Sequence, residues 1–328
     1  MIWRNRLSNT AAALAAISST RRCVSSLPLP LSNHALESIQ YRINACNRPP
    51  GNPENFVPFV IDGRKLGSVR TSFASELSTR WSNVFNLSDA LTISKSIEPT
   101  RSARSQAIAT PLATLRDEGK IDGWRDELLS VVDSFDEFDD PVLLIERAAM
   151  PHFGCRSYGV HMNGYIEGED GEVESLWVGR RSLQKQTSPG MLDHLVAGGQ
   201  PFGISPYDNM VKECQEEASI PVDIAAKVQC GGFVSYSYAK DNDHQIKQDT
   251  LFCYDLAVPR DFIPTPCDGE VQDFRLFSIE EVIEHFAKDH QDPFKPNCCL
   301  VIIDFLVRKN ILTAGMRGYE KIVKTLRQ

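Results

Sequence analysis

The sequence predicts an α/β (α+β) chain, with a mixed β-sheet in its C-terminal half and a smaller α+β unit before it. Three observations predict this class. The length of 328 residues suits about two domains. A hydrophobic content of 42% with 24% charged residues is typical of globular proteins. Strand-like and helix-like patterns interleave from residue 155 onward.

The composition also excludes several classes of protein. The formal net charge of -8 argues against a nucleic-acid-binding protein, which needs a basic surface. No run of apolar residues approaches the length of about 18 that a membrane span requires. The nine cysteines show no repeated spacing, so we interpret them as reduced thiols and not as a disulfide framework.

Residues 1–36 have the composition of an organelle transit peptide. They contain four arginines, are rich in serine and alanine, and hold no acidic residue before Glu37. Arginine-rich, serine-rich segments without acids are typical of imported precursors. The predicted destination is the mitochondrion. A plastid is the alternative, and the cytoplasm is expected if the segment is not cleaved.

Residues 37–150 are the predicted N-terminal α+β domain. A short apolar run closed by Asp62-Gly63 predicts a strand over Phe56–Ile61. Three further segments have a helix-like spacing of apolar residues, and these are Ser88–Ile93, Ala107–Leu115 and Trp124–Phe135. We interpret the acidic run 133–140 as a solvated loop. The domain offers no recognisable chemistry, and covering a substrate pocket or forming a homodimer are the roles considered for it.

Residues 151–328 are the predicted second domain, in which strands and helices alternate. The expected strands are Cys155–Ile166, Glu174–Arg181, Lys227–Tyr238, Asp249–Val258 and Val271–Phe277. The expected helices are Ser205–Ser219, Ile279–Phe286 and Asn297–Ile311. A glycine-centred segment, 190–203, leads into the first helix, and Pro206 near its start suits a helix N-terminus.

Three carboxylates on that helix are the main chemical signal. Glu213, Glu216 and Glu217 are spaced so that their side chains share one helix face. They repel one another, and a hard divalent cation such as Mg²⁺ would remove that cost. Gly198 and Gly199 would let the backbone approach the same ion or a phosphate. Taken alone, the spacing is also common on exposed helix faces.

The linked pattern of strand, Gly-Gly turn, loop and Lys-Glu-x-x-Glu-Glu-Ala resembles the signature of the Nudix hydrolase family. With Gly198 in the first position, the three glutamates fill the acidic positions of the helix. The sequence departs from the signature at Ile204, where a loop glutamate is expected. It also departs at Lys212, where arginine is expected, and at Ser219, where the closing glycine is expected. Lysine lacks arginine's bidentate fork, which leaves some freedom in the orientation of Glu213.

A closer resemblance covers more of the chain. The stretches Arg156–Tyr165, Trp177–Arg181 and Lys185–Thr187 are similar to the thiamine-pyrophosphokinase-related Nudix proteins of fungi and plants. The resemblance implies a Nudix-type mixed sheet between helices, preceded by a conserved N-terminal domain. It also implies hydrolysis of thiamine diphosphate, or of its oxidised or damaged analogues, to the monophosphate. The implied cofactor is Mg²⁺, with Mn²⁺ as a substitute.

The resemblance and the residue chemistry together suggest roles for further residues. Glu213 and Glu217 would hold the metal, and Glu216 would share a second ion or position water. Glu270, before the Val271–Phe277 strand, is a candidate base or ligand, or an ordinary turn residue. The candidate phosphate-binding and substrate-facing residues are Arg180, Arg181, Lys185, Tyr158 and His161. Each of these also has a structural interpretation, as a solvated cation or a packed side chain.

Several alternatives stay open at this point. The substrate could be a nucleoside diphosphate derivative such as ADP-ribose or NADH, and the chain could be a catalytically weak Nudix-fold binding protein. Isopentenyl diphosphate isomerase also resembles this family and has a cysteine-bearing motif before the glutamate helix. Asn297-Cys298-Cys299 is superficially similar to that motif, but it follows the glutamate helix, so we discount this alternative. We interpret these cysteines as small residues on a buried helix. No Cys-x-x-Cys or matching histidine pair predicts a zinc site.

Overall fold

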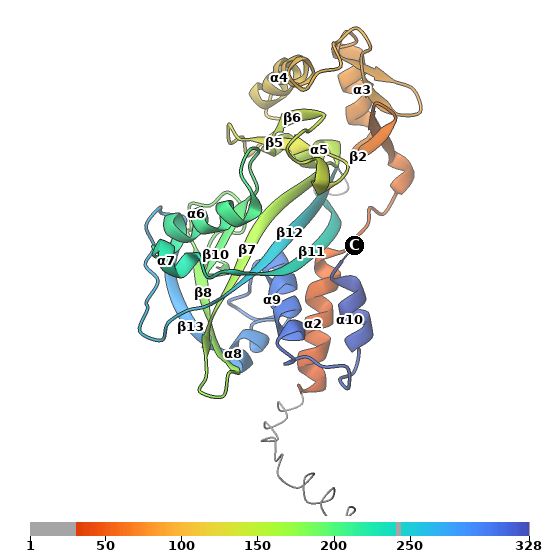
Figure 1. Cartoon of the computed structure of the whole chain (residues 1–328). Helices are drawn as coiled ribbons and strands as arrows, with labels where there is room; N and C mark the ends of the chain where they lie inside the picture. The colour runs from red at the N-terminus through yellow and green to blue at the C-terminus, as the bar shows by residue number, and fades with distance from the viewer. Residues whose placement is uncertain (1–30, 241–243, 328) are drawn as a thin grey trace, which may run out of the picture.

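The computed structural model describes residues 31–240 and 244–327 (Figure 1). Most of the predicted transit peptide therefore lies outside the described residues. Its last residues belong to helix α2 (Asn33–Cys46), whose N-cap Ser32 accepts a hydrogen bond from the Ala35 N–H at 3.1 Å. Leu36 is buried in the core, so the folded chain begins before the predicted boundary at residue 36.

The N-terminal unit is built around a small sheet. Its four strands lie in the order β2-β1-β4-β3, and β5 and β6 form a separate antiparallel pair. The strands are β1 (Phe56–Ile61), β2 (Arg64–Arg70), β3 (Phe85–Leu87), β4 (Leu91–Ile93), β5 (Leu128–Val131) and β6 (Leu143–Glu146). The helices are α3 (Thr71–Arg80), α4 (Arg101–Asp117) and the short α5 (Met150–Phe153). They enclose a core of their own.

Two of the predicted helices of this unit are wrong, and the other elements predicted here are confirmed. The predicted strand coincides with β1, and Ala107–Leu115 lies within α4. Ser88–Ile93 instead contributes β4, which pairs in parallel with β1. Trp124–Phe135 contains β5, and its backbone takes a positive φ of 56° at Asp126. Pairing with neighbouring strands overrides the helix-like apolar spacing of these short segments.

The acidic run 133–140 is more than a solvated loop. Phe135 and Phe138 project from it onto the second unit. The Phe135 ring lies 5.0 Å from the Tyr158 ring and 4.6 Å from the Phe252 ring, centroid to centroid. These aromatic contacts join the two units.

The second unit is a seven-stranded mixed sheet. The main path is β11-β12-β7-β8-β13, with β10 paired to β7 and β9 paired to β8. The strands are β7 (Arg156–Glu167), β8 (Val173–Arg181), β9 (Leu192–Asp193), β10 (Val196–Gly199), β11 (Gln229–Lys240), β12 (Gln245–Ala257) and β13 (Val271–Ser278). All five predicted strands are present, but β11 and β12 both extend into the segment between the predicted ends at Tyr238 and Asp249. The β12–β7 pair is parallel and the other pairs are antiparallel.

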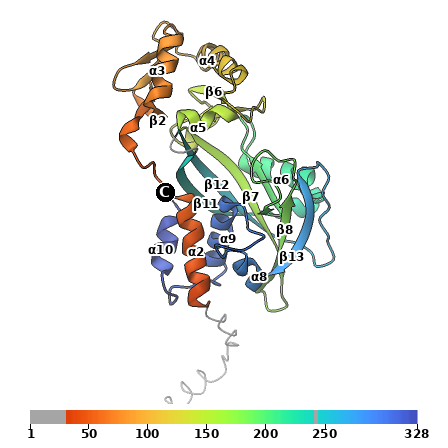
Figure 2. The same ribbon diagram turned by 180° about the vertical axis from the view of Figure 1, so that it is seen from behind.

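Helices cover both faces of this sheet, as the resemblance to the Nudix family implies (Figures 1 and 2). Helix α6 (Pro206–Ala218) packs on one face, followed by the short α7 (Val222–Ala225). The other face carries α8 (Ile279–Glu284), α9 (Pro296–Arg308), α10 (Tyr319–Thr325) and α2. The sequence assigned α2 to the N-terminal unit, whereas its apolar residues pack with α9.

One edge of β7 pairs with two different strands along its length. Its first half pairs with β10, where Val160 is opposite Gly198, and its second half pairs with β8. The sheet therefore splits beside β10, directly under α6. Among the described residues, no helix combines the length and apolar character that a membrane crossing requires.

Candidate active site

Helix α6 presents two of its glutamates to the sheet. Met210 and Cys214, one turn apart, are fully buried against β7 and fix the rotation of the helix. That rotation turns Glu213 and Glu217 toward β10. The Ala197 N–H of β10 donates a hydrogen bond to Oε2 of Glu217 at 2.8 Å. Glu217 is only 7% exposed, so its carboxylate is held inside the protein.

Gly198 leaves space for Glu213. A Cβ atom at residue 198 would lie 2.4 Å from Oε1, 2.5 Å from Cδ and 2.7 Å from Cγ of Glu213. A side chain at residue 198 would therefore occupy the place of this carboxylate. The neighbouring Gly199 has ordinary contacts, since its nearest atom is Nη1 of Arg147 at 3.4 Å. The first glycine of the pair is thus the one that the glutamate requires.

A second segment brings two further acids to Glu217. Asp268 and Glu270 lie in the turn before β13, and Oδ1 of Asp268 accepts a hydrogen bond from the Glu270 N–H at 2.8 Å. Carboxylate oxygens of Glu217, Asp268 and Glu270 lie within 4.8 Å of one another. The structure thus brings Glu270 to the glutamate helix and adds Asp268, which was not among the sequence candidates.

The electrostatics of this acidic cluster favour a bound cation. Burial raises the pKa of Glu217 well above its ordinary value, and the nearby charge of Glu213 adds to the rise. Burial also raises the pKa of Glu213, against the opposing effect of Lys212. Asp268 and the side chain of Glu270 are exposed, so the electrostatic cost rests on the buried Glu217 and the partly buried Glu213, whose charges a bound cation would compensate. Oxygen ligands at this spacing fit a hard divalent metal ion.

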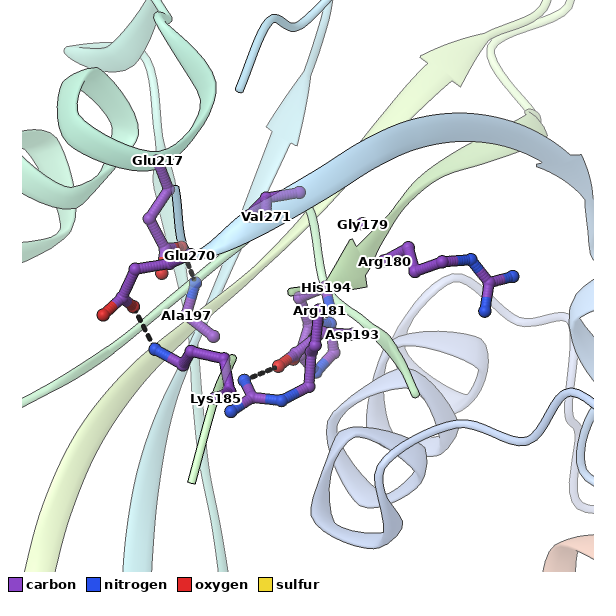
Figure 3. A pocket seen from close by; sticks show the side chains of 10 residues that line it. All are labelled: Gly179, Arg180, Arg181, Lys185, Asp193, His194, Ala197, Glu217, Glu270 and Val271. Atoms are coloured by element: carbon purple, nitrogen blue, oxygen red, sulfur yellow. Dashed lines mark hydrogen bonds and ion pairs between the residues drawn. The ribbon is translucent and has the colours of Figure 1, made fainter. Parts of the chain in front are cut away.

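Lys185 supplies a positive charge beside the acids. Its Nζ donates a hydrogen bond to Oε2 of Glu270 (Figure 3). Burial is the largest single influence and would raise the pKa of Glu270, but this hydrogen bond and the positive charges of Lys185, Arg181 and Arg125 together lower it. Both residues line a pocket with Glu217 and His194, and its cavity of about 10 Å³ is the room that about one water needs. A larger ligand requires these side chains to move.

The two predicted phosphate-binding arginines are already engaged. Arg181 Nη1 donates to Oδ2 of Asp193 at 2.7 Å, and its other nitrogens donate to the carbonyls of Thr187 and Ser188. Arg180 extends away from the acids in Figure 3 and pairs with Asp292 at 2.5 Å. Both arginines line the same pocket as Lys185, but of the three cations it is Lys185 that hydrogen bonds to an acid of the cluster.

Tyr158 and His161 both lie on β7, but neither faces the acids of α6. Tyr158 packs in the aromatic contacts between the two units. His161 lies opposite Ala197 in the β10 register and is 4% exposed. It is packed edge to face against His194, which was not a sequence candidate. Burial lowers the pKa of His194 to about 4, so the ring is neutral at neutral pH.

The outer side of α6 holds the remaining motif residues. Lys212 Nζ lies 2.5 Å from Oε2 of Glu216 and 3.7 Å from Oε1 of Glu213. The Glu216 side chain is 50% exposed and lies outside the acidic cluster. The structure thus pairs Lys212 more closely with Glu216, whereas the sequence suggested Glu213 as its partner.

Ser219 ends α6 in a conformation that suits glycine. Its φ of 54° is left-handed, which explains why the family signature has glycine there. The Ser219 hydroxyl donates to the Thr265 carbonyl at 2.9 Å, which ties the helix end to the segment before Asp268. Ile204, at the other departure, offers its carbonyl to the Gln200 side chain at 2.7 Å.

Comparison with known proteins identifies the family. The domain of unknown function DUF4743 matches residues 38–157, and the NUDIX domain matches residues 157–298. Nudix hydrolase 20, chloroplastic, of Arabidopsis thaliana is 42% identical over 297 residues, which cover 87% of this chain and 76% of that protein. Nudix hydrolase 24, chloroplastic, of the same plant is 39% identical over 303 residues, covering 91% and 80%.

A third relative is an uncharacterized protein of Saccharomyces cerevisiae, 35% identical over 278 residues that cover 77% of each chain. The two plant relatives are similar to this chain over most of the length of each protein. The glutamate helix α6 packs on the mixed sheet beside β10, where the sheet divides. The chain therefore belongs to the Nudix hydrolases, the pyrophosphohydrolase family, and has a DUF4743 domain before its Nudix domain.

Proposed function

We propose that this Nudix hydrolase cleaves the diphosphate linkage of thiamine diphosphate, or of its oxidised or damaged analogues, to leave the monophosphate. One observation carries the reaction type: carboxylate oxygens of Glu217, Asp268 and Glu270 gather beside Lys185 at one pocket. The thiamine part is supported by the resemblance of the β7 and β8 segments to the thiamine-pyrophosphokinase-related Nudix proteins.

The acidic cluster is suited to Mg²⁺, with Mn²⁺ as a substitute that accepts the same oxygen ligands. Glu217, Asp268 and Glu270 would hold the ion, together with Glu213, which the Gly198 gap admits. When bound, the ion would neutralise the diphosphate and make a bound water more acidic. We keep Glu216 as a candidate for a second ion once it separates from Lys212.

The chain's own residues prepare this site. The Ala197 N–H holds one oxygen of Glu217 and so fixes where its carboxylate points. Lys185 keeps Glu270 ionised, in the form that serves as a ligand or accepts a proton from water. The Lys185 ammonium is also the nearest cation for a phosphate oxygen, and the phosphate would compete with Glu270 for it.

A substrate panel tests the proposal. The full chain with Mg²⁺ would be assayed for phosphate-containing products from thiamine diphosphate, its oxo and oxy analogues, ADP-ribose and NADH. We expect the highest kcat/KM on a thiamine-type diphosphate. Preference for a nucleotide would refute the substrate and keep the reaction type. Binding without turnover of any compound would instead favour a catalytically weak binding protein.

We also propose that the residues before Ser32 direct import into the mitochondrion. The proposed boundary precedes the α2 cap, since cleavage after residue 36 would remove the first turn of a packed helix. The printed names of the two plant relatives say chloroplastic, so a plastid is the competing destination. A fluorescent protein fused to residues 1–31 would colocalise with mitochondrial markers, and diffuse or plastid fluorescence would contradict the proposal.

A further inference from the structure

A buried cluster of nitrogen and sulfur groups lies behind the wall of the pocket. His161 comes from β7, His194 from the connection between β9 and β10, and Cys298 from the first turn of α9. One ring nitrogen of each histidine and Sγ of Cys298 lie within 4.8 Å of one another. Each histidine is 4% exposed and the cysteine is 0% exposed. Three distant segments thus bring metal-ligating atoms to one buried point.

Two atoms of this cluster are unpaired. Among the residues that the structure describes, Nδ1 of His161 and Nε2 of His194 have no hydrogen-bond partner. The rings meet nearly at right angles, with an interplanar angle of 86° and centroids 5.0 Å apart. Buried polar atoms are rarely left unpaired in native proteins, because each loses its hydrogen bonds to water. A ligand that reached these nitrogens would satisfy them.

An ionised carboxylate borders the cluster. The Cys298 thiol donates to Oδ1 of Asp193 at 2.7 Å, while Oδ2 of Asp193 accepts from Arg181 at 2.7 Å. Lys295 Nζ lies 3.7 Å from the same carboxylate. Arg181 and Lys295 therefore keep Asp193 ionised beside the sulfur of Cys298. Its carboxylate can accept a hydrogen bond from the thiol or contact a cation.

We propose that His161, His194 and Cys298 bind a zinc ion, with Asp193 as the carboxylate that completes the site. Two imidazoles and a thiolate are ligands that zinc favours, whereas Mg²⁺ prefers oxygen. Zn–N and Zn–S bonds of about 2.1 and 2.3 Å in a tetrahedral site place the ligand atoms about 3.4 to 3.6 Å apart, which is within the 4.8 Å limit, so side-chain rotations draw them onto the ion. The Cys298 thiol loses its proton to solvent as Sγ binds the ion.

The proposed ion has a structural consequence for the pocket. His194 lines the pocket that holds Glu217 and Glu270, so an ion on its other side would fix that wall to α9. This zinc site uses none of the acidic residues assigned to Mg²⁺. The inference therefore stands independently of the proposed substrate.

Metal content tests the inference directly. The full chain would be dialysed against a weak chelator, and zinc per chain would be measured by inductively coupled plasma mass spectrometry. We expect about one zinc per chain, with at least about a tenfold weaker affinity in Cys298→Ser. Cys299→Ser is the matched control, because Cys299 is adjacent, equally buried and outside the cluster. Glu217→Gln is the control for the acidic cluster. Both controls should keep the zinc.

Cobalt substitution is a second test, and it uses the wild-type chain, so it does not require that any variant folds. Co²⁺ added to the metal-free wild-type chain should produce the near-ultraviolet absorption of a cobalt–thiolate bond, saturating at one equivalent. Wild-type protein that holds no zinc and gives no such absorption would overturn the proposal. Equal zinc affinity in Cys298→Ser and wild type would overturn it as well.

Discussion

Gly198→Ala should weaken metal-dependent activity, because the added methyl group would displace the carboxylate of Glu213. The added Cβ would lie 2.4 to 2.7 Å from three side-chain atoms of Glu213, distances that real Cβ atoms do not tolerate. Gly198 is not among the residues with positive φ, so alanine suits its backbone. The strain therefore falls on the Glu213 side chain, which must rotate away from β10.

The magnitude follows from the cost of this overlap. Inserting a methyl group into a packed position costs about 1 to 3 kcal/mol. If Glu213 must return to its original position to bind the ion, the free energy of metal binding becomes less favourable by this amount. Since about 1.4 kcal/mol is a factor of ten, the half-saturating Mg²⁺ concentration should rise about 5-fold to 150-fold.

The assay is the rate of diphosphate hydrolysis as a function of Mg²⁺ concentration. Gly199→Ala is the matched control, because it adds the same carbon to the next residue, where the nearest atom is 3.4 Å away. Circular dichroism would establish that both variants fold. The reasoning is refuted if the two variants show the same Mg²⁺ dependence.

Three further outcomes are expected. Lys185→Met should lower kcat/KM about tenfold to 150-fold, because it removes a charged hydrogen bond worth about 1.5 to 3 kcal/mol, and an unchanged value would exclude a phosphate contact. Gly67→Ala should destabilise the chain by about 1 to 3 kcal/mol, because its Cβ would lie 2.2 Å from the Phe153 carbonyl oxygen. Thermal unfolding checks this, and Gly315→Ala, whose Cβ meets no described atom within 4 Å, should leave the midpoint unchanged. Hydrogen bonds from Arg80 and Lys120 lower the pKa of Glu118 from 4.5 to about 2, so its stabilising effect is present above pH 4.5 and is lost as the pH falls toward 2. Glu118→Gln should therefore lose less thermal stability than wild type across that range, and parallel curves would contradict the assignment.

The sequence predicted the second unit well because its strands are long and its helices amphipathic. β7, β8 and α6 were each placed within two residues of their ends, since their apolar periodicity agrees with their burial. The N-terminal unit was harder, because β4 has only three residues and β5 four. Such short strands exist only through pairing, β4 with β3 and β1 and β5 with β6, and the apolar spacing of one segment does not reveal its partners.

In the candidate site as well, the residues with a local sequence pattern were predicted and those that depend on tertiary contacts were not. Glu213 and Glu217 were predicted because helical spacing places them on one face. Asp268 was missed as a candidate, although its position two residues before Glu270 could have indicated it. The engagement of Arg180 with Asp292 and the meeting of His161 with Cys298 depend on tertiary contacts between separate segments. Residue spacing along the chain carries no signal for these.

The most direct test of the catalytic assignment compares wild type with Glu217→Gln in Mg²⁺-dependent diphosphate hydrolysis. Glutamine keeps the shape and can still accept the Ala197 N–H hydrogen bond, but it removes the buried charge from the acidic cluster. Glu174→Gln, which removes an exposed carboxylate paired with Arg260, is the control. We predict that Mg²⁺ stimulates wild type and the control, and that Glu217→Gln loses this turnover while remaining folded. Equal Mg²⁺-dependent rates in all three proteins would contradict the account.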